Sequence, residues 1–373
     1  MSRIHQTIEW LHLYSGLAAA PLLLLLGLTG SYLTFEYPLE RLLNPGLNYV
    51  HPLPTRLPLD RLVDIVQKAY AESRVSSMAL SPYSAALDIA YTVRLAGPNK
   101  AVSTIYIDQY TGQILGEHSG HTLSTAVHDL HTNLLTGEDG PGTIFLVLTA
   151  VLLMLLSATG IILWWPRKIL HVNWSASSRR IVFDLHNTLG FYSFAFMLLF
   201  AITGVIIHWQ SIMLPSANRA LHISDLEPEF HSKAPNPTAQ RQSLEDVVRT
   251  AGIAVSGARV TQISLPKGTG VYRVWMKFPE DSTPLGRTNL LIDPYTGAVL
   301  WQRTSRTAPI TTRFFRQWNR ELHTGDILGW PGRVVMCAIS LTLPVLAVTG
   351  PLFWFRKRRK ANPARTVAAV ASR

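Results

Sequence analysis

WLHLYSGLAAAPLLLLLGLTGSYLTF (residues 10–35) contains no Asp, Glu, Lys or Arg, and it is long enough to cross a membrane, which takes about 20 mostly apolar residues. A simple membrane anchor needs neither the histidine near its start nor the Thr-Gly pair near its end. LHNTLGFYSFAFMLLFAITGVIIHW (residues 185–209) repeats both features at the same spacing. The matching positions are His12, Gly16, Thr29 and Gly30 in the first stretch, and His186, Gly190, Thr203 and Gly204 in the second.

Two further windows without these four charged residue types bring the expected membrane spans to four. Charged residues make up 15% of the 373 residues, against roughly 25% in soluble domains. The stretch TGSYLTF offers no small-residue cleavage site, so we expect the first span to be an uncleaved helix and not a signal peptide. The four windows are Trp10–Phe35, Pro141–Trp165, Leu185–Asn218 and Val334–Phe355.

Basic residues in the short connections predict the orientation of the chain. Lys and Arg cluster in Arg167–Arg180 and after residue 355, and the positive-inside rule assigns such segments to the cytoplasm. Four spans then place both termini in the cytoplasm and the two long polar stretches in the periplasm, as in a multi-pass protein of a bacterial inner membrane. Topology explains much of the net charge of +11, so we expect contact with anionic membrane lipid and no nucleic-acid binding.

Each long polar stretch carries the pattern of a small α+β unit. An amphipathic run, LDRLVDIVQKAYAE (59–72) or LEDVVRTAGIAV (244–255), predicts a helix. Downstream, YIDQYTGQIL (106–115) and LIDPYTGAVL (291–300) place a turn between apolar runs, which predicts a β-hairpin. The plan of span, outer unit and span therefore occurs twice, as in parallel halves related by a two-fold axis along the membrane normal.

The fold class expected from this plan is a membrane α+β protein, with four transmembrane helices in two pseudo-symmetric halves. The expected segments are a helix in 1–35, an outer domain in 36–140, a helix in 141–166, a cytoplasmic loop in 167–184, a helix in 185–209, an outer domain in 210–329, a helix in 330–355 and a basic cytoplasmic tail in 356–373.

The ordered motifs resemble the PepSY-associated transmembrane family over residues 5–360. They are LHLYSGL…LTG, IDQYTG, LHTNLLTG…ATGIILWW, DLHNTLG…ITG, IDPYTG and LHTGDILGWPGR…VTGPLFW. Within that family the sequence is most similar to inner-membrane ferrisiderophore reductases of the FoxB type. The resemblance implies PepSY-like outer domains, and a haem-carrying protein that moves electrons to iron chelates in the periplasm.

Four histidines occupy equivalent positions in the two halves. His12 and His186 lie at the cytoplasmic ends of spans one and three, whereas His131 and His323 precede spans two and four near the periplasmic face. A two-fold axis between equivalent histidines leaves one imidazole on each side of a gap, an arrangement that suits an iron porphyrin in a four-helix bundle. We therefore expect two b-type haems, because the single cysteine excludes covalent attachment through C-x-x-C-H.

Several residues near these histidines have more than one interpretation. Gly16 and Gly190 lie one turn from their histidines, where they either leave room for the porphyrin or allow close helix packing. His128 and His208 are alternative ligands without a histidine counterpart in the other half. Carboxylates adjacent in sequence are expected to orient the imidazoles, and arginines are expected either to meet haem propionates or to serve topology alone. The carboxylates are Asp184, Asp129 and Glu321, and the arginines are Arg3, Arg179, Arg180, Arg320 and Arg333.

The expected function is transmembrane electron transfer to a periplasmic ferric siderophore, with release of Fe(II). The sequence has no G-x-G-x-x-G that opens a βαβ unit, so quinol or a separate reductase is the expected electron donor. No side chain is expected to act as an acid, a base or a nucleophile. The alternative is a haem-free PepSY scaffold that binds or restrains a periplasmic partner such as a peptidase.

Overall fold

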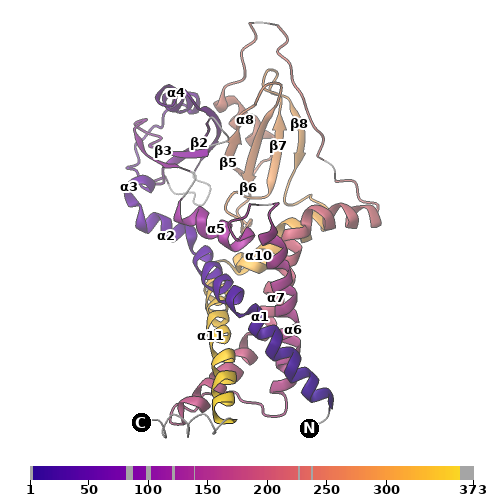
Figure 1. Cartoon of the computed structure of the whole chain (residues 1–373). Helices are drawn as coiled ribbons and strands as arrows, with labels where there is room; N and C mark the ends of the chain where they lie inside the picture. The colour runs from indigo at the N-terminus through magenta and orange to yellow at the C-terminus, as the bar shows by residue number, and fades with distance from the viewer. Residues whose placement is uncertain are drawn as a thin grey trace. The chain divides into compact units, whose positions relative to one another are not determined.

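The chain folds into two compact units, which the computed structural model describes over residues 3–80, 87–97, 102–119, 122–137, 139–225, 227–236 and 238–361 (Figure 1). One unit comprises residues 1–35, 126–211 and 322–373, and the other comprises residues 36–125 and 212–321. Of the expected basic tail 356–373, residues 362–373 lie outside the described part.

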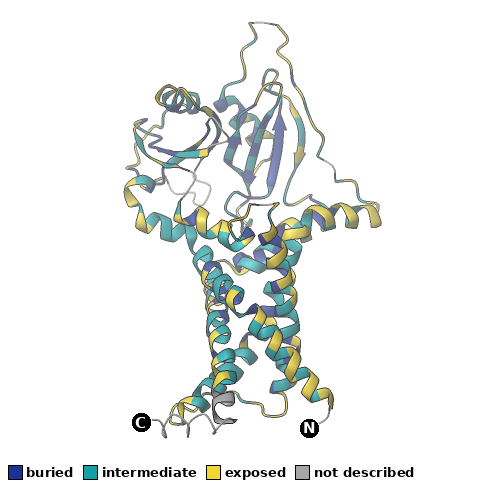
Figure 2. Ribbon diagram, viewed as in Figure 1, coloured by how far each residue is buried: buried dark blue, intermediate teal, exposed yellow. Residues whose placement is uncertain are grey.

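The first unit is built from four long apolar helices, as the sequence predicted. They are α1 (Arg3–Thr34), α6 (Pro141–Trp164), α7 (Ser178–Ala220) and α11 (Gly329–Ala361). Each is long and apolar enough to cross a membrane, and many large apolar side chains on them are exposed, among them Leu28, Phe145 and Leu341 (Figure 2). Exposed apolar side chains on long helices are typical of surfaces that face lipid.

Close packing in this unit depends on small residues. Helix α1 packs against α6 and α11, and it approaches α11 closely at Gly27. A Cβ at Gly27 would lie 2.4 Å from Cδ of Pro344 and 2.7 Å from the Ser340 carbonyl oxygen. Ser340 donates its hydroxyl to the Gly27 carbonyl at 2.9 Å. Small residues that let helix backbones approach and bond across the interface are the usual device in membrane bundles.

The second unit contains one continuous antiparallel sheet with the strand order β4-β3-β2-β1-β5-β6-β7-β8. Its halves are two four-stranded meanders, and strands β1 and β5 pair between them from Ser77↔Ser264 to Ala79↔Gln262. This junction was not predicted, because sequence repeats reveal similar units but not how they pair. The strands are β1 (Arg74–Ala79), β2 (Tyr91–Ala96), β3 (Val102–Ile107), β4 (Ile114–Ser119), β5 (Arg259–Ser264), β6 (Tyr272–Lys277), β7 (Thr288–Ile292) and β8 (Val299–Arg303).

Both predicted β-hairpins form, and the ID-x-Y-T-G motif explains their turns. The side chain of Asp108 accepts hydrogen bonds from the backbone N–H groups of Tyr110 and Thr111 between β3 and β4. Asp293 makes the same two bonds between β7 and β8. The glycine that closes each turn has a positive φ, +76° at Gly112 and +72° at Gly297, a conformation that favours glycine.

The two predicted amphipathic helices form the core of this unit against the sheet. They are α4 (Leu59–Ala69) and α8 (Leu244–Ala254), and their apolar faces are buried with the central strands. Each helix supplies a carboxylate that accepts a hydrogen bond from the first backbone N–H group of the other helix. Asp60 accepts from Leu244 and Glu245 accepts from Leu59, both at 2.9 Å. Free N–H groups at helix starts need such acceptors, so the exchange joins the two halves.

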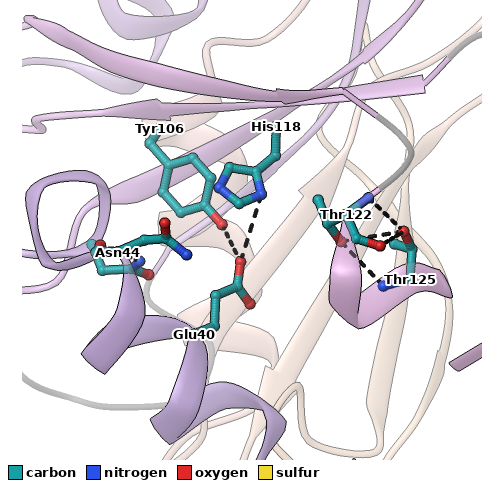
Figure 3. A network of polar contacts seen from close by, with 7 residues as sticks. Glu40, Asn44, Tyr106, His118, Thr122 and Thr125 are labelled. Carbon is teal, nitrogen blue, oxygen red and sulfur yellow. Dashed lines mark hydrogen bonds and ion pairs between the residues drawn. The ribbon is translucent and has the colours of Figure 1, made fainter. Parts of the chain in front are cut away.

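Short helices complete the structure. Helix α2 (Glu36–Leu43) carries Glu40, whose carboxylate accepts a hydrogen bond from the Tyr106 hydroxyl at 2.9 Å and lies 4.0 Å from Nδ1 of His118 (Figure 3). Thr122 and Thr125, also in Figure 3, exchange hydrogen bonds at the start of α5. The remaining helical segments are α3 (Pro45–Asn48), α5 (Leu123–Asn133), α9 (Ile310–Thr312), a π-helical turn (Arg313–Trp318), α10 (Asn319–Thr324) and a 3₁₀ turn (Asp326–Leu328).

Candidate functional site

The four histidines singled out by the repeat form two facing pairs within the first unit. The ring centroids of His12 on α1 and His186 on α7 are 6.3 Å apart, with an interplanar angle of 87°. Those of His131 on α5 and His323 on α10 are 6.5 Å apart, with an angle of 66°. We name the first pair site I and the second pair site II.

Both separations match two imidazoles that share one metal ion. An imidazole nitrogen bonds a transition metal at about 2.0–2.1 Å and lies about 1 Å from its ring centre, so two rings on opposite sides of the metal have centroids about 6 Å apart. Direct edge-to-face contacts between rings have centroids about 4.5–7 Å apart, so the two separations fit a shared metal and also lie within the range of a ring contact. The described residues contain no group of three or more His, Cys, Asp or Glu side chains arranged around a metal position. Paired imidazoles on different helices suit the iron of a porphyrin, so the residues present fit that group.

A threonine on a different helix holds each imidazole through Nδ1. The hydrogen bonds are His12 to Thr159 at 2.9 Å, His186 to Thr349 at 3.0 Å, His131 to Thr29 at 2.8 Å and His323 to Thr203 at 2.8 Å. All four threonines belong to the Thr-Gly pairs that recur in the sequence. The pairs therefore act between helices, with each histidine docked on the Thr-Gly of a neighbouring helix.

The same threonines determine which ring nitrogen carries the proton. Each hydroxyl donates its single hydrogen to the carbonyl four residues earlier, as Thr159 does to Leu155 at 2.6 Å and Thr349 does to Val345 at 2.7 Å. Thr29 and Thr203 make the equivalent bonds. The hydroxyl oxygen must then accept from the imidazole, which places the proton on Nδ1. The Nε2 lone pair is left for a metal, as in histidine ligands generally.

The glycine of each Thr-Gly pair makes room for the imidazole. A Cβ at Gly160 would lie 3.2 Å from Cε1 of His12, and one at Gly350 would lie 3.3 Å from Cε1 of His186. At site II the corresponding distances are 3.2 Å at Gly30 and 3.7 Å at Gly204. Three of these four positions are therefore tighter than ordinary van der Waals contact, so any larger residue would push the ring away from its partner.

Site I opens into a cavity of about 830 Å³ between the four helices, within the size range of cofactor pockets. Its lining includes both histidines and the predicted glycines Gly16 and Gly190. A Cβ at Gly16 would meet only Leu156 at 3.6 Å, and one at Gly190 only Leu346 at 3.9 Å. Neither glycine is needed for close packing between helices at these distances, so their missing side chains add free space beside the histidines.

Site II is formed by short helices and not by the spans that follow them. Gly137 and two non-glycine residues with positive φ, Leu134 and Leu135, separate α5 from α6, so His131 is not on a continuation of that span. The Phe200 ring lies 5.5 Å from that of His323. Burial, with a smaller contribution from His323, lowers the pKa of His131 to about 3. The ring is thus neutral near pH 7, the form that binds a metal.

The other predicted residues lie elsewhere or have different partners. His128 is exposed and lies 3.7 Å from Asp129, and His208 is exposed beside Trp209. The neighbouring carboxylate Asp184 forms an ion pair with Arg180 at 2.7 Å. Each imidazole is oriented through Nδ1 by a threonine from another helix. Sequence reasoning missed these threonines, although their recurrence before glycine was the available signal.

One family model matches nearly the whole chain in comparisons with known proteins. A family model described as PepSY-associated TM region matches residues 9–357. No curated protein matches the chain. The crystal structure of a protein assigned as a lipoprotein from Clostridium difficile 630 aligns at 11% identity with a TM-score of 0.29, covering 69% of this chain and 98% of that one.

Proposed function

Because the chain belongs to the PepSY-associated TM region family, we propose that it is a membrane oxidoreductase that holds two b-type haems and carries electrons across the membrane. The observation that carries this proposal is the pair of facing imidazole couples, with centroids 6.3 and 6.5 Å apart. A haem held by these histidine imidazoles would supply one-electron redox chemistry.

In this proposal the protein's residues do the binding and the orientation. His12 and His186 are the ligands of site I, and His131 and His323 are the ligands of site II. Each of the four threonines holds a histidine ring through Nδ1. The Nε2 atom of that ring is then the one that binds the metal. Support for two separate centres comes from α1, which contributes His12 to site I and Thr29 to site II. Seventeen residues of helix separate these positions by about 25 Å, most of the thickness of a bilayer core.

The proposed acceptor is a ferric siderophore on the periplasmic side, with site II as the centre nearer to it. One electron converts the bound Fe(III) to Fe(II), which oxygen-rich chelators hold more weakly, so the metal is released. The proposed donor is quinol or a separate reductase on the cytoplasmic side. This orientation, in a bacterial inner membrane with both termini inside, rests on the positive-inside rule. The resemblance to FoxB-type reductases supports the same assignment.

The test is haem stoichiometry in purified full-length protein. We expect two haems per chain by pyridine haemochrome, and a red shift of the Soret band when dithionite is added. His12→Ala or His186→Ala should each remove one haem, and His131→Ala or His323→Ala should each remove the other. His128→Ala is the matched control, because this histidine is one turn from His131 but exposed.

Two outcomes contradict the proposal. A wild-type protein with no haem spectrum supports the alternative, a haem-free scaffold for a periplasmic partner. Full haem content in all four histidine variants removes the assignment of the ligands. The acceptor is tested separately, by following Fe(II) release from a ferric siderophore with a ferrous-specific chelator after chemical reduction of the protein.

A further inference from the structure

A second cavity, of about 490 Å³, lies near the start of α7 and is lined mainly by arginine and phenylalanine. Its guanidinium groups come from Arg167, Arg179 and Arg180. Arg167, Phe183 and Phe353 also line the cavity of site I. The two cavities therefore meet at shared side chains, and a molecule bound at site I borders the arginine-lined cavity.

The arginine-lined cavity has an excess of positive charge. Asp184 is buried, with 2% of its side chain exposed, and bonds Arg180 at 2.7 Å. Arg167 lies over the Phe183 ring at 5.2 Å and Arg179 lies over the Phe353 ring at 5.8 Å. Within the described part of the chain neither of these two arginines has a carboxylate at ion-pair distance. Within the described residues, Arg167 and Arg179 thus line the cavity without a carboxylate partner.

The distance from the histidines suits a group that extends from site I. Arg179 and Arg180 precede His186 on α7 by seven and six residues, or about 10 and 9 Å along the helix. Phe353 lies three residues beyond Gly350, the glycine that contacts His186. The charged lining therefore begins about 9–10 Å along α7 from His186, on the side away from site II.

We infer that the arginine-lined cavity binds the two propionate carboxylates of the porphyrin held at site I, with Arg167 and Arg179 as their main partners. The inference rests on the proposed function and extends it to residues that determine which porphyrin is accepted. Guanidinium groups form strong, often bidentate bonds to carboxylates. The phosphate of an anionic lipid offers the same oxygen chemistry, so the experiment must distinguish the two sources.

The experiment compares protohaem with its dimethyl ester, which lacks the two negative charges but keeps the iron. Full-length apo-protein carrying His131→Ala, which leaves site I intact, is titrated with each porphyrin in zwitterionic detergent. Arg167→Gln and Arg179→Gln should each weaken protohaem binding by about ten-fold, as expected for one charged hydrogen bond, and should leave ester binding unchanged. Lys168→Gln is the control, because this neighbouring cation lies over Trp165 and outside the cavity lining.

The outcomes separate the inference from the proposed function. If neither porphyrin binds the starting protein with a bis-imidazole spectrum, the proposed function fails. If both bind but the arginine variants lose affinity for both porphyrins equally, or for neither, the inference is overturned. A repeat in vesicles of phosphatidylcholine with or without phosphatidylglycerol tests the lipid source. An arginine effect that appears only with phosphatidylglycerol assigns the cavity to a lipid phosphate and overturns the inference.

Discussion

Replacing Thr159 with valine should weaken haem binding at site I without unfolding the bundle. The valine keeps the shape of threonine but removes the oxygen that accepts the His12 Nδ1–H at 2.9 Å. The substitution also removes the hydroxyl that donates to the Leu155 carbonyl. This carbonyl lies inside α6 and keeps its backbone hydrogen bond within the helix. The imidazole N–H then loses its threonine partner at a half-buried position, and the ring loses the contact that fixes its tautomer and orientation.

The size of the effect follows from these contacts. An unsatisfied buried donor costs about 1–3 kcal/mol, and loss of a residue that orients a metal ligand lowers metal affinity about 10- to 100-fold. These ranges agree, since ten-fold corresponds to about 1.4 kcal/mol. The reduction potential of the site should also rise, because a less basic imidazole stabilises Fe(III) less.

The assay is haem titration of full-length apo-protein in the His131→Ala background, followed by a redox titration. Thr159→Ser should restore most of the affinity and the potential, because it keeps the hydroxyl. Thr149→Val is the matched control, since Thr149 is buried on the same helix and donates to its own helix at 2.7 Å, without a bond to a histidine. Equal affinity in Thr159→Val and wild type, or an equal loss in Thr149→Val, would refute the reasoning.

Three further predictions concern packing and charge. Gly160→Val should lower the haem content at site I in the pyridine haemochrome assay, because its Cβ alone would lie 3.2 Å from the histidine ring; retained content would contradict this role. Gly27→Ala should destabilise the protein by about 1–3 kcal/mol and so lower its melting temperature in detergent, because the methyl group would lie 2.4 Å from a proline carbon on α11. Gly252→Ala is the control and should not lower the melting temperature, because the space around Gly252 is open. Burial raises the pKa of Asp60 above its ordinary value, so the folded state binds this proton more tightly and the wild-type carboxylate costs stability as pH rises. The melting temperature of Asp60→Asn minus that of the wild type should therefore be more positive at pH 7 than at pH 4. The same difference at both pH values would contradict this prediction.

Patterns within the sequence were sufficient to predict the long helices, the two amphipathic helices and the two hairpins of this protein. Uncharged windows of spanning length predicted α1, α6, α7 and α11, because a helix in lipid must be apolar around its circumference. Amphipathic runs predicted α4 and α8, and the ID-x-Y-T-G motif predicted both hairpins, because their turns depend on an Asp side chain and a glycine a few residues apart. Equal offsets in the two halves also singled out His12 and His186, and the repeated histidine segment before spans two and four singled out His131 and His323.

Contacts between distant segments were decided only by the tertiary structure. Sequence spacing did not reveal the β1–β5 junction, the exchange of carboxylates between α4 and α8, or the docking of each histidine on the Thr-Gly of another helix. The partner of His12 is 147 residues away, and no local pattern measures the distance between such residues. A one-dimensional repeat shows that two positions are equivalent, whereas packing of the helices determines which side chains come within hydrogen-bond distance.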